Sequence, residues 1–221
     1  MHWRAIIRLF GLLLMFYSLS FLPSLIVSWI YSDGQWITFI GSSLIVFLLG
    51  LSLWLSNYHQ RQELSVRDGF LVVTLFWFIL GLVGALPFYL SLHLGFTDAV
   101  FESISGFTTT GATVIVGLDQ LPQSILYHRQ QIQWLGGMGI IVLAVAILPL
   151  LGVGGMQLYR AETSGVAKNE KMTPRIAETA RSLWLIYLLL TVCCALAYWF
   201  AGMSFFDAVG HAFTTVATGG F

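Results

Sequence analysis

The spacing of the charged residues is the feature that most constrains this chain. Five stretches between successive charges hold 24, 27, 29, 30 and 25 uncharged residues. A helix needs about 20 consecutive apolar residues to cross the hydrocarbon core of a bilayer, and each stretch exceeds that length. The pattern therefore predicts five transmembrane helices, near residues 9–30, 36–56, 70–91, 132–156 and 182–202.

The composition agrees with a membrane protein. Only 9% of the residues are charged and 57% are hydrophobic, whereas about 25% of the residues of a soluble domain are charged. The formal net charge is zero, which gives no support to nucleic-acid binding, because that function needs a basic surface. The first apolar run is too long for a signal peptide. We expect an all-α polytopic membrane protein that contacts membrane lipid and keeps its first helix.

The positive charges predict how the spans are oriented. Nine of the ten Lys and Arg residues precede span one or fall between spans two and three or spans four and five, and Arg129 is the exception. Cytoplasmic loops carry an excess of Lys and Arg, so we expect a cytoplasmic N-terminus. Two segments that these spans do not explain, 95–128 and 203–221, then lie on the outer face.

Those two outer segments contain a repeated element. Each copy begins with Asp-Ala-Val, at Asp98 and Asp207, continues through about ten mostly apolar residues and a Thr-rich stretch, and ends in glycine. The distance from Asp98 to Gly111 is 13 residues and that from Asp207 to Gly219 is 12, so a slip of one residue, or the use of Gly220, is allowed. Ten residues make half a span, and acids suit the first turn of a helix. We expect two re-entrant half-helices.

Such segments are suited to cation coordination. Non-helical backbone inside a membrane is tolerated where it lines a water-filled cavity, and rings of backbone carbonyls replace the hydration shell of an ion in a pore. Glycine allows the backbone to approach the ion closely. The predicted ion ligands, mostly through main-chain oxygen, are Thr109, Thr110, Gly111, Ala217, Thr218 and Gly219. The acids predicted to enrich cations at the outer mouth are Asp98, Glu102 and Asp207, together with Asp119.

Three other interpretations remain open. A single Thr/Gly stretch near a membrane is often only a loop or a helix-packing face, although two copies favour the pore. Asp207 and His211 are four residues apart and would pair on a helix, but the chain carries none of the hydrolase motifs that we considered, so we expect no enzyme. A proton- or sodium-coupled symporter with re-entrant loops is the closer alternative.

Four segments together resemble the TrkH potassium uptake proteins of the Trk/Ktr/HKT superfamily: FESISGFTTTGAT (101–113), QWLGGMGI (133–140), GVGGMQLYRAE (152–162) and TVATGGF (215–221). The resemblance implies a potassium channel-like pore of four helix–P-loop–helix repeats after an extra N-terminal helix pair. It also implies a multi-pass protein of the bacterial inner membrane, K⁺ as the transported ion bound at the filter, and glycine at each filter position for potassium selectivity. A homodimer and a cytosolic TrkA-like ring that binds NAD and ATP are the implied partners.

The same resemblance implies a division of the chain. Residues 1–66 correspond to the extra helix pair, 67–160 to the first repeat, 161–180 to a cytoplasmic loop and 181–221 to an incomplete second repeat that ends at its filter. Two further repeats are missing from the four. We therefore expect the chain to be a fragment of a longer protein.

Overall fold

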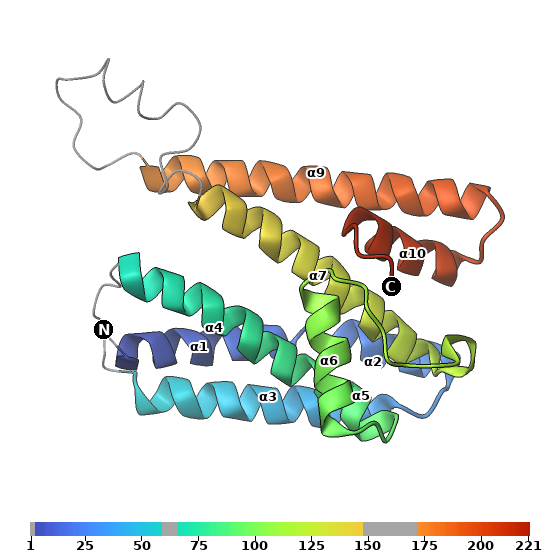
Figure 1. Ribbon diagram of the computed structural model, residues 1–221, viewed down its shortest axis with the longest axis horizontal. Helices are drawn as coiled ribbons and strands as arrows, with labels where there is room; N and C mark the ends of the chain where they lie inside the picture. Colours follow the sequence, from blue (N-terminus) through green and yellow to red (C-terminus); the bar gives the residue numbers. More distant parts are fainter. Residues whose placement is uncertain (1–2, 59–65, 148–171) are drawn as a thin grey trace, which may run out of the picture.

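A computed structural model describes residues 3–58, 66–147 and 172–221 of the chain, and every regular element in these ranges is helical (Figure 1). The long helices are α1 (Trp3–Ser18), α3 (Trp36–Ser56), α4 (Val66–Gly84), α7 (Gln123–Ile147) and α9 (Met172–Phe200). The shorter ones are α2 (Phe21–Tyr31), α5 (Leu86–Ser91), α6 (Phe96–Phe107), the 3₁₀ turn η1 (Leu118–Gln120) and α10 (Phe205–Val216).

Four segments are long and apolar enough to cross a membrane: Trp3–Tyr31, Trp36–Ser56, Leu71–Ser91 and Glu178–Phe200. They coincide with four of the five predicted spans. The predicted span at 132–156 extends beyond the described residues, but its described part lies in α7, which begins at Gln123 rather than near residue 132. The all-α polytopic membrane fold is therefore confirmed. The predicted cytoplasmic loop lies largely outside the described residues, and the domain boundaries stay predictions.

The first span is broken between α1 and α2. The backbone tightens into three-residue turns there, with the amide of Ser20 donating to the carbonyl of Tyr17 at 2.8 Å. Pro23 lacks the amide hydrogen that a continuous helix would need at that position. The carbonyl of Ser20, the residue before α2, accepts a hydrogen bond from Nε2 of Gln131 on α7 at 2.8 Å. A polar side chain of α7 thus binds the backbone at the break.

Two glycines let α1 and α3 approach closely. A Cβ atom built on Gly50 would lie 2.7 Å from the carbonyl oxygen of Gly11, and one on Gly11 would lie 2.6 Å from the amide nitrogen of Trp54. Small residues at helix crossings allow such backbone contact inside membranes. The pair α1–α3 therefore forms a tightly packed unit at one side of the bundle.

Buried aromatic side chains join this helix pair to α7. The imidazole of His128 on α7 is stacked on Phe21 and packs against Phe39 and Phe88, which come from α2, α3 and α5. Its Nε2 lies 3.0 Å from the carbonyl oxygen of Gly84 at the end of α4. One side chain thus connects five helices in the core.

The loop between α2 and α3 also holds the start of α7. Asp33 accepts hydrogen bonds from the amide of Ser124 at 2.9 Å, from the amide of Gln35 at 3.1 Å and from the hydroxyl of Ser28. The first amides of a helix have no partner within the helix, and a carboxylate is favoured at this positive end. Asp33 therefore caps α7 from outside its own segment.

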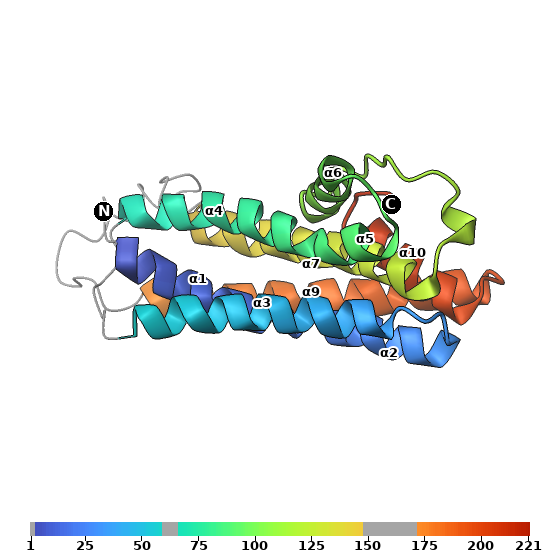
Figure 2. The ribbon, with the colours of Figure 1, turned by 90° about the horizontal axis from the view of Figure 1, so that it is seen from below.

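The short helices α6 and α10 lie in the same half of the molecule, together with the C-terminal residue, while the N-terminus lies at the opposite end (Figures 1 and 2). Figure 1 shows α6 lying across the long helices and α10 lying beside the end of α9 that leads into it. Both short helices pack against α7, and α6 also packs against α4 and α10 against α9.

The glycine crossing generates a matched prediction. Gly50→Ala should lower the free energy of unfolding by about 1–3 kcal/mol, because the added methyl group meets the backbone of α1. Gly41→Ala on the same helix should be tolerated, because nothing lies within 4 Å of its Cβ position. Thermal unfolding of the purified protein in detergent compares the two. Equal losses of stability would show that the crossing is not tightly packed.

Asp33 generates a prediction about pH. Desolvation raises the pKa of this carboxyl group, but the hydrogen bonds from Ser124, Ser28 and Gln35 together lower it further, to below its ordinary value. Because the pKa is lower in the folded state, the ionised carboxylate stabilises the fold at pH values above the ordinary carboxyl pKa. This stabilisation is lost as the pH falls through the pKa of the folded state. Asp33→Asn should therefore cost about 0.3–1 kcal/mol at neutral pH, because it removes the negative charge from the positive end of α7.

Melting temperatures measured between about pH 3 and pH 8 check this sign. The difference between wild type and Asp33→Asn should be constant above about pH 5 and should shrink below about pH 4. A difference that grew as the pH fell would contradict the assignment of Asp33 as a charged cap.

Candidate functional site

The two predicted half-helices are present and have the same length. Helices α6 and α10 each have 12 residues, and their starts and ends are both 109 residues apart (205 − 96 and 216 − 107). Asp98 and Asp207 stand at the same offset, in the first turn of each helix. The residues before the two helices also share one extended conformation, with φ −57° and ψ 147° at Gly95 and φ −59° and ψ 152° at Ser204.

The loops that follow the two helices repeat the same backbone path. Left-handed φ angles occur at Thr109 (55°) and Gly111 (74°) in the first loop and at Thr218 (57°) and Gly220 (71°) in the second. The offset is again 109 residues.

Matching hydrogen bonds close both helices. The amides of Thr109 and Thr110 donate to the carbonyls of Gly106 and Ser105, both at 2.9 Å. The amides of Thr218 and Gly219 donate to the carbonyls of Thr215 and Thr214, at 2.9 and 3.1 Å.

This equivalence resolves the register that the sequence left open by one residue. Gly111 corresponds to Gly220 and Thr110 to Gly219, so the second loop aligns as 218–220. Ala217 corresponds to Thr108, since each is the C-cap of its helix. The sequence alignment on Gly219 was one residue early, because Gly219 and Gly220 are adjacent and the sequence alone does not show which of them takes the left-handed conformation of Gly111.

The two loops touch each other through their backbones. A Cβ atom on Gly111 would overlap the carbonyl oxygen of Gly219. At a φ of +74° a side chain at position 111 would also strain the backbone. Segments that are more than one hundred residues apart in sequence thus meet at the glycines that the repeat had singled out.

A buried ion pair lies behind the first loop. Glu102 on α6 and Arg129 on α7 have side-chain exposures of 0% and 3%, and Nε of Arg129 lies 2.5 Å from Oε1 of Glu102. The same carboxylate accepts hydrogen bonds from the hydroxyl of Thr113 at 2.9 Å and from the amide of Val114 at 3.0 Å. Glu102 therefore attaches the chain just beyond Gly111 to the half-helix that precedes it.

Arg129 extends this attachment to the second loop. Its guanidinium carbon lies 3.6 Å from the centre of the ring of Phe221, the residue after Gly220. A cation over an aromatic face is attractive, and more so when the contact is desolvated. Arg129 is thus linked to the chain beyond both loops, directly at Phe221 and through Glu102 at Thr113 and Val114.

Gln133, one turn along α7 from Arg129, lies between the loops. Its Oε1 accepts a hydrogen bond from the amide of Phe221 at 3.2 Å. Its amide group occupies the space that a side chain at Gly219 would need. Neither Gln133 nor this role of Arg129 followed from the sequence, because Arg129 had been placed in a loop before span four. The available signal was that Arg129 is the one basic residue on the predicted outer side.

A cavity of about 280 Å³ lies against the C-terminal ends of the two half-helices. The C-terminal end of a helix carries partial negative charge, so both helices favour a cation in this space. The lining includes Thr109, Ala217 and Thr218 from the loops and Gly137, Ile140 and Tyr187 from α7 and α9.

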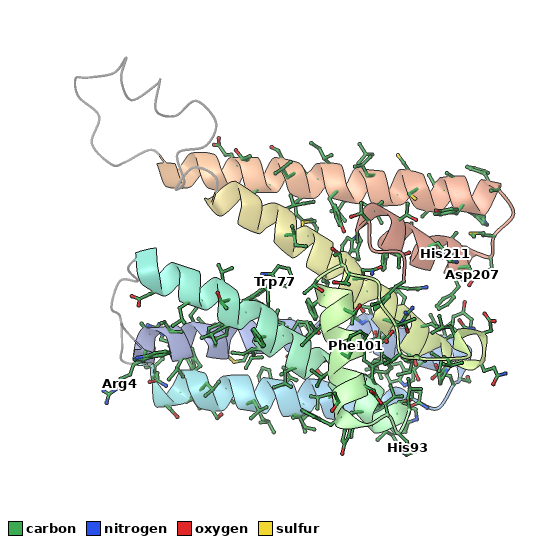
Figure 3. The ribbon with its side chains drawn as sticks, in the orientation of Figure 1. Arg4, Trp77, His93, Phe101, Asp207 and His211 are labelled. Atoms are coloured by element: carbon green, nitrogen blue, oxygen red, sulfur yellow. The ribbon has the colours of Figure 1, made fainter. Side chains whose placement is uncertain are left out.

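The predicted mouth acids divide into two kinds. Asp98, Asp119 and Asp207 are exposed, and Asp207 accepts a hydrogen bond from Ser204 at 2.7 Å. Glu102 is instead fully buried, because its charge is neutralised by Arg129. Its position differs from the exposed one that we expected. Asp207 and His211 lie on α10 at the end of the molecule opposite Arg4 (Figure 3).

Comparison with known proteins assigns the family. Residues 37–221 match the sequence profile of TrkH, described as a cation transport protein. The chain belongs to the TrkH family. This assignment confirms the resemblance and shows that the family is one of transport proteins rather than of enzymes.

Relatives match over the whole of this chain. It is 59% identical to the Trk system potassium uptake protein TrkH of Escherichia coli K12 and 43% identical to TrkG of the same strain, and it covers 46% of each. The crystal structure of the potassium transporter TrkH from Vibrio parahaemolyticus superposes with a TM-score of 0.87 at 51% identity, over all of this chain and 44% of that one. The chain thus spans about half the length of these relatives.

The buried pair generates a prediction for stability. Glu102→Gln should lower the free energy of unfolding by about 3–5 kcal/mol, because it leaves Arg129 buried without a counter-charge. Asp98→Asn, on the same helix but exposed, should change it by less than about 0.5 kcal/mol. Denaturation of both variants in detergent provides the comparison. A Glu102→Gln protein as stable as Asp98→Asn would show that the pair does not hold the site together.

Proposed function

We propose that this chain is part of the ion-translocating subunit of a Trk system and takes up K⁺ through a selectivity filter built from re-entrant loops. Segments 109–111 and 218–220 are two of the filter segments. The observation that carries the proposal is the backbone contact between Gly111 and Gly219 at equivalent turns of two repeated half-helices.

The chemistry follows from the backbone. An ion entering the filter loses its water shell, and carbonyl oxygens of the two loops replace part of it. Because no carboxylate is needed at the loops, the site favours a monovalent over a divalent ion. The negative ends of α6 and α10 attract the cation toward the cavity beneath, and the exposed Asp98 and Asp207 concentrate cations at the entrance.

Potassium is the proposed ion on two grounds. The relatives carry names that describe potassium uptake. Glycine stands at both equivalent filter positions, Gly111 and Gly220. The register supports Thr109, Thr110, Gly111, Thr218, Gly219 and Gly220 as the ligand-bearing residues, with Ala217 lining the cavity.

The assembly and orientation are part of the same proposal. The basic N-terminal end, with Arg4, lies opposite the end that carries Asp207 (Figure 3), which supports a cytoplasmic N-terminus in a bacterial inner membrane. A Trk system implies further components, and we propose a cytosolic TrkA-like ring that binds NAD and ATP, and a homodimer of the transport subunit.

A channel is favoured over an ion-coupled symporter. The spans that precede the two half-helices, α4 and α9, run in the same direction (Figure 1), so the repeats are parallel around one path, whereas many symporters are built from inverted repeats. Currents through the complete native protein decide between them. A reversal potential that follows the potassium gradient alone supports the channel, and strict dependence on an imposed proton or sodium gradient supports the symporter.

Gly111→Ser tests the filter. The added side chain meets the carbonyl of Gly219 and restricts the backbone, so the preference for rubidium over sodium should fall at least about tenfold, which corresponds to ~1.4 kcal/mol. Gly117→Ser is the matched control, because Gly117 has the same φ of 74° but nothing within 4 Å of its Cβ position.

The measurement is rubidium uptake, with sodium as competitor, in cells that lack their own potassium uptake and express the complete native protein. Saturable uptake by wild type and Gly117→Ser, with altered selectivity only in Gly111→Ser, supports the assignment. Identical selectivity in all three proteins would remove loop 109–111 from the permeation path.

A further inference from the structure

Gln133 is a buried side chain between the two loops that is not among the proposed ion ligands. It is 0% exposed. Its Oε1 accepts the hydrogen bond from Phe221, whereas its Nε2 has no hydrogen-bond partner among the described residues. The hydrogen bond fixes which end of the amide faces Phe221, so the NH₂ group faces the loops.

The surroundings of that NH₂ group are backbone. A Cβ atom on Gly219 would overlap Nε2 and Cδ of Gln133, and one on Gly111 would lie 3.8 Å from Nε2. The amide therefore fills the space behind Gly219 and reaches toward Gly111. It acts as a spacer where the two loops meet.

Its neighbour Gln131 provides a contrast on the same helix. Gln131 is also buried, at 6% exposure, but both ends of its amide are hydrogen-bonded. Its partners are Ser20 and Ser24 at the break in the first span. The two glutamines, two residues apart, thus face opposite sides of α7. Gln131 faces the break in the first span, and Gln133 faces the loops.

We propose that Gln133 is a positioning residue for ion selectivity: it sets the separation of the loop backbones at Gly111 and Gly219. The inference rests on the proposed filter. Whether discrimination comes from the size of the carbonyl ring or from the field of its dipoles, it depends on the distances between carbonyls. A side chain that packs behind Gly219 and reaches toward Gly111 fixes how closely the two loops approach each other, and so controls those distances without touching the ion.

The test compares Gln133→Met with Gln131→Met in the complete native protein. Both changes keep the side-chain volume nearly constant and replace a buried amide with an apolar side chain. The readouts are the ratio of rubidium to sodium uptake and the amount of protein in the membrane. Gln133→Met should lower the ratio roughly tenfold. Gln131→Met should leave the ratio at the wild-type value, even where it lowers stability.

A second experiment does not depend on Gln133→Met being produced. Gly219→Ala places a methyl group against the Gln133 amide, and Gln133→Ala removes that amide. If Gln133 is the spacer, the double variant should recover part of the selectivity lost in Gly219→Ala alone. Such non-additivity is the mark of residues in contact.

The outcomes separate this inference from the function on which it rests. Wild-type protein without saturable rubidium uptake would defeat the proposed function itself. Uptake that responds to Gly111→Ser while Gln133→Met keeps the wild-type ratio would overturn only the role of Gln133. Losses that simply add in the double variant, or equal changes in Gln131→Met, would do the same.

Discussion

The buried pair of Glu102 and Arg129 is the interaction on which the site depends. A carboxylate and a guanidinium without solvent are tolerated only when each satisfies the other, and here each also contacts a loop. Glu102 accepts hydrogen bonds from the hydroxyl of Thr113 and the amide of Val114, and the guanidinium of Arg129 lies over the ring of Phe221. The charges that stabilise the interior therefore also fix the positions of two polar backbone segments that have no regular secondary structure.

Among the described residues, helix α7 connects the N-terminal helices, both half-helices and α9. Its first turn is capped by Asp33 from the loop between α2 and α3. His128 packs in the aromatic core, and Gln131 donates a hydrogen bond to the carbonyl of Ser20 at the break between α1 and α2. Trp134 donates a hydrogen bond to Thr191 on α9 at 3.0 Å and stacks on Phe213 of α10. The N-terminal helix pair thus supports the candidate filter through α7.

Much of this arrangement follows from sequence, and the missing parts have physical reasons. Charge-free stretches predicted the described spans, and the repeated Asp-Ala-Val predicted α6 and α10, because length and hydropathy act locally. The exact register of the second loop did not follow, since Gly219 and Gly220 are adjacent and only the backbone angles show which of them matches Gly111. Nor did the burial of Glu102, because it requires Arg129 from a helix whose start could not be located by hydropathy alone.

Three of the polar contacts of α7 face different sides of the helix, with Gln131 toward α1 and α2, Gln133 toward the loops and Trp134 toward α9. A shift of one residue along an α-helix is a rotation of about 100°, so any appreciable rotation of α7 would break all three contacts at once. Gly136 adds a further restriction, because its Cα lies against the carbonyl of Phe107 at the end of α6. These contacts therefore oppose rotation of α7 on its own. The helix can move the loops only by moving together with its neighbours as one rigid body.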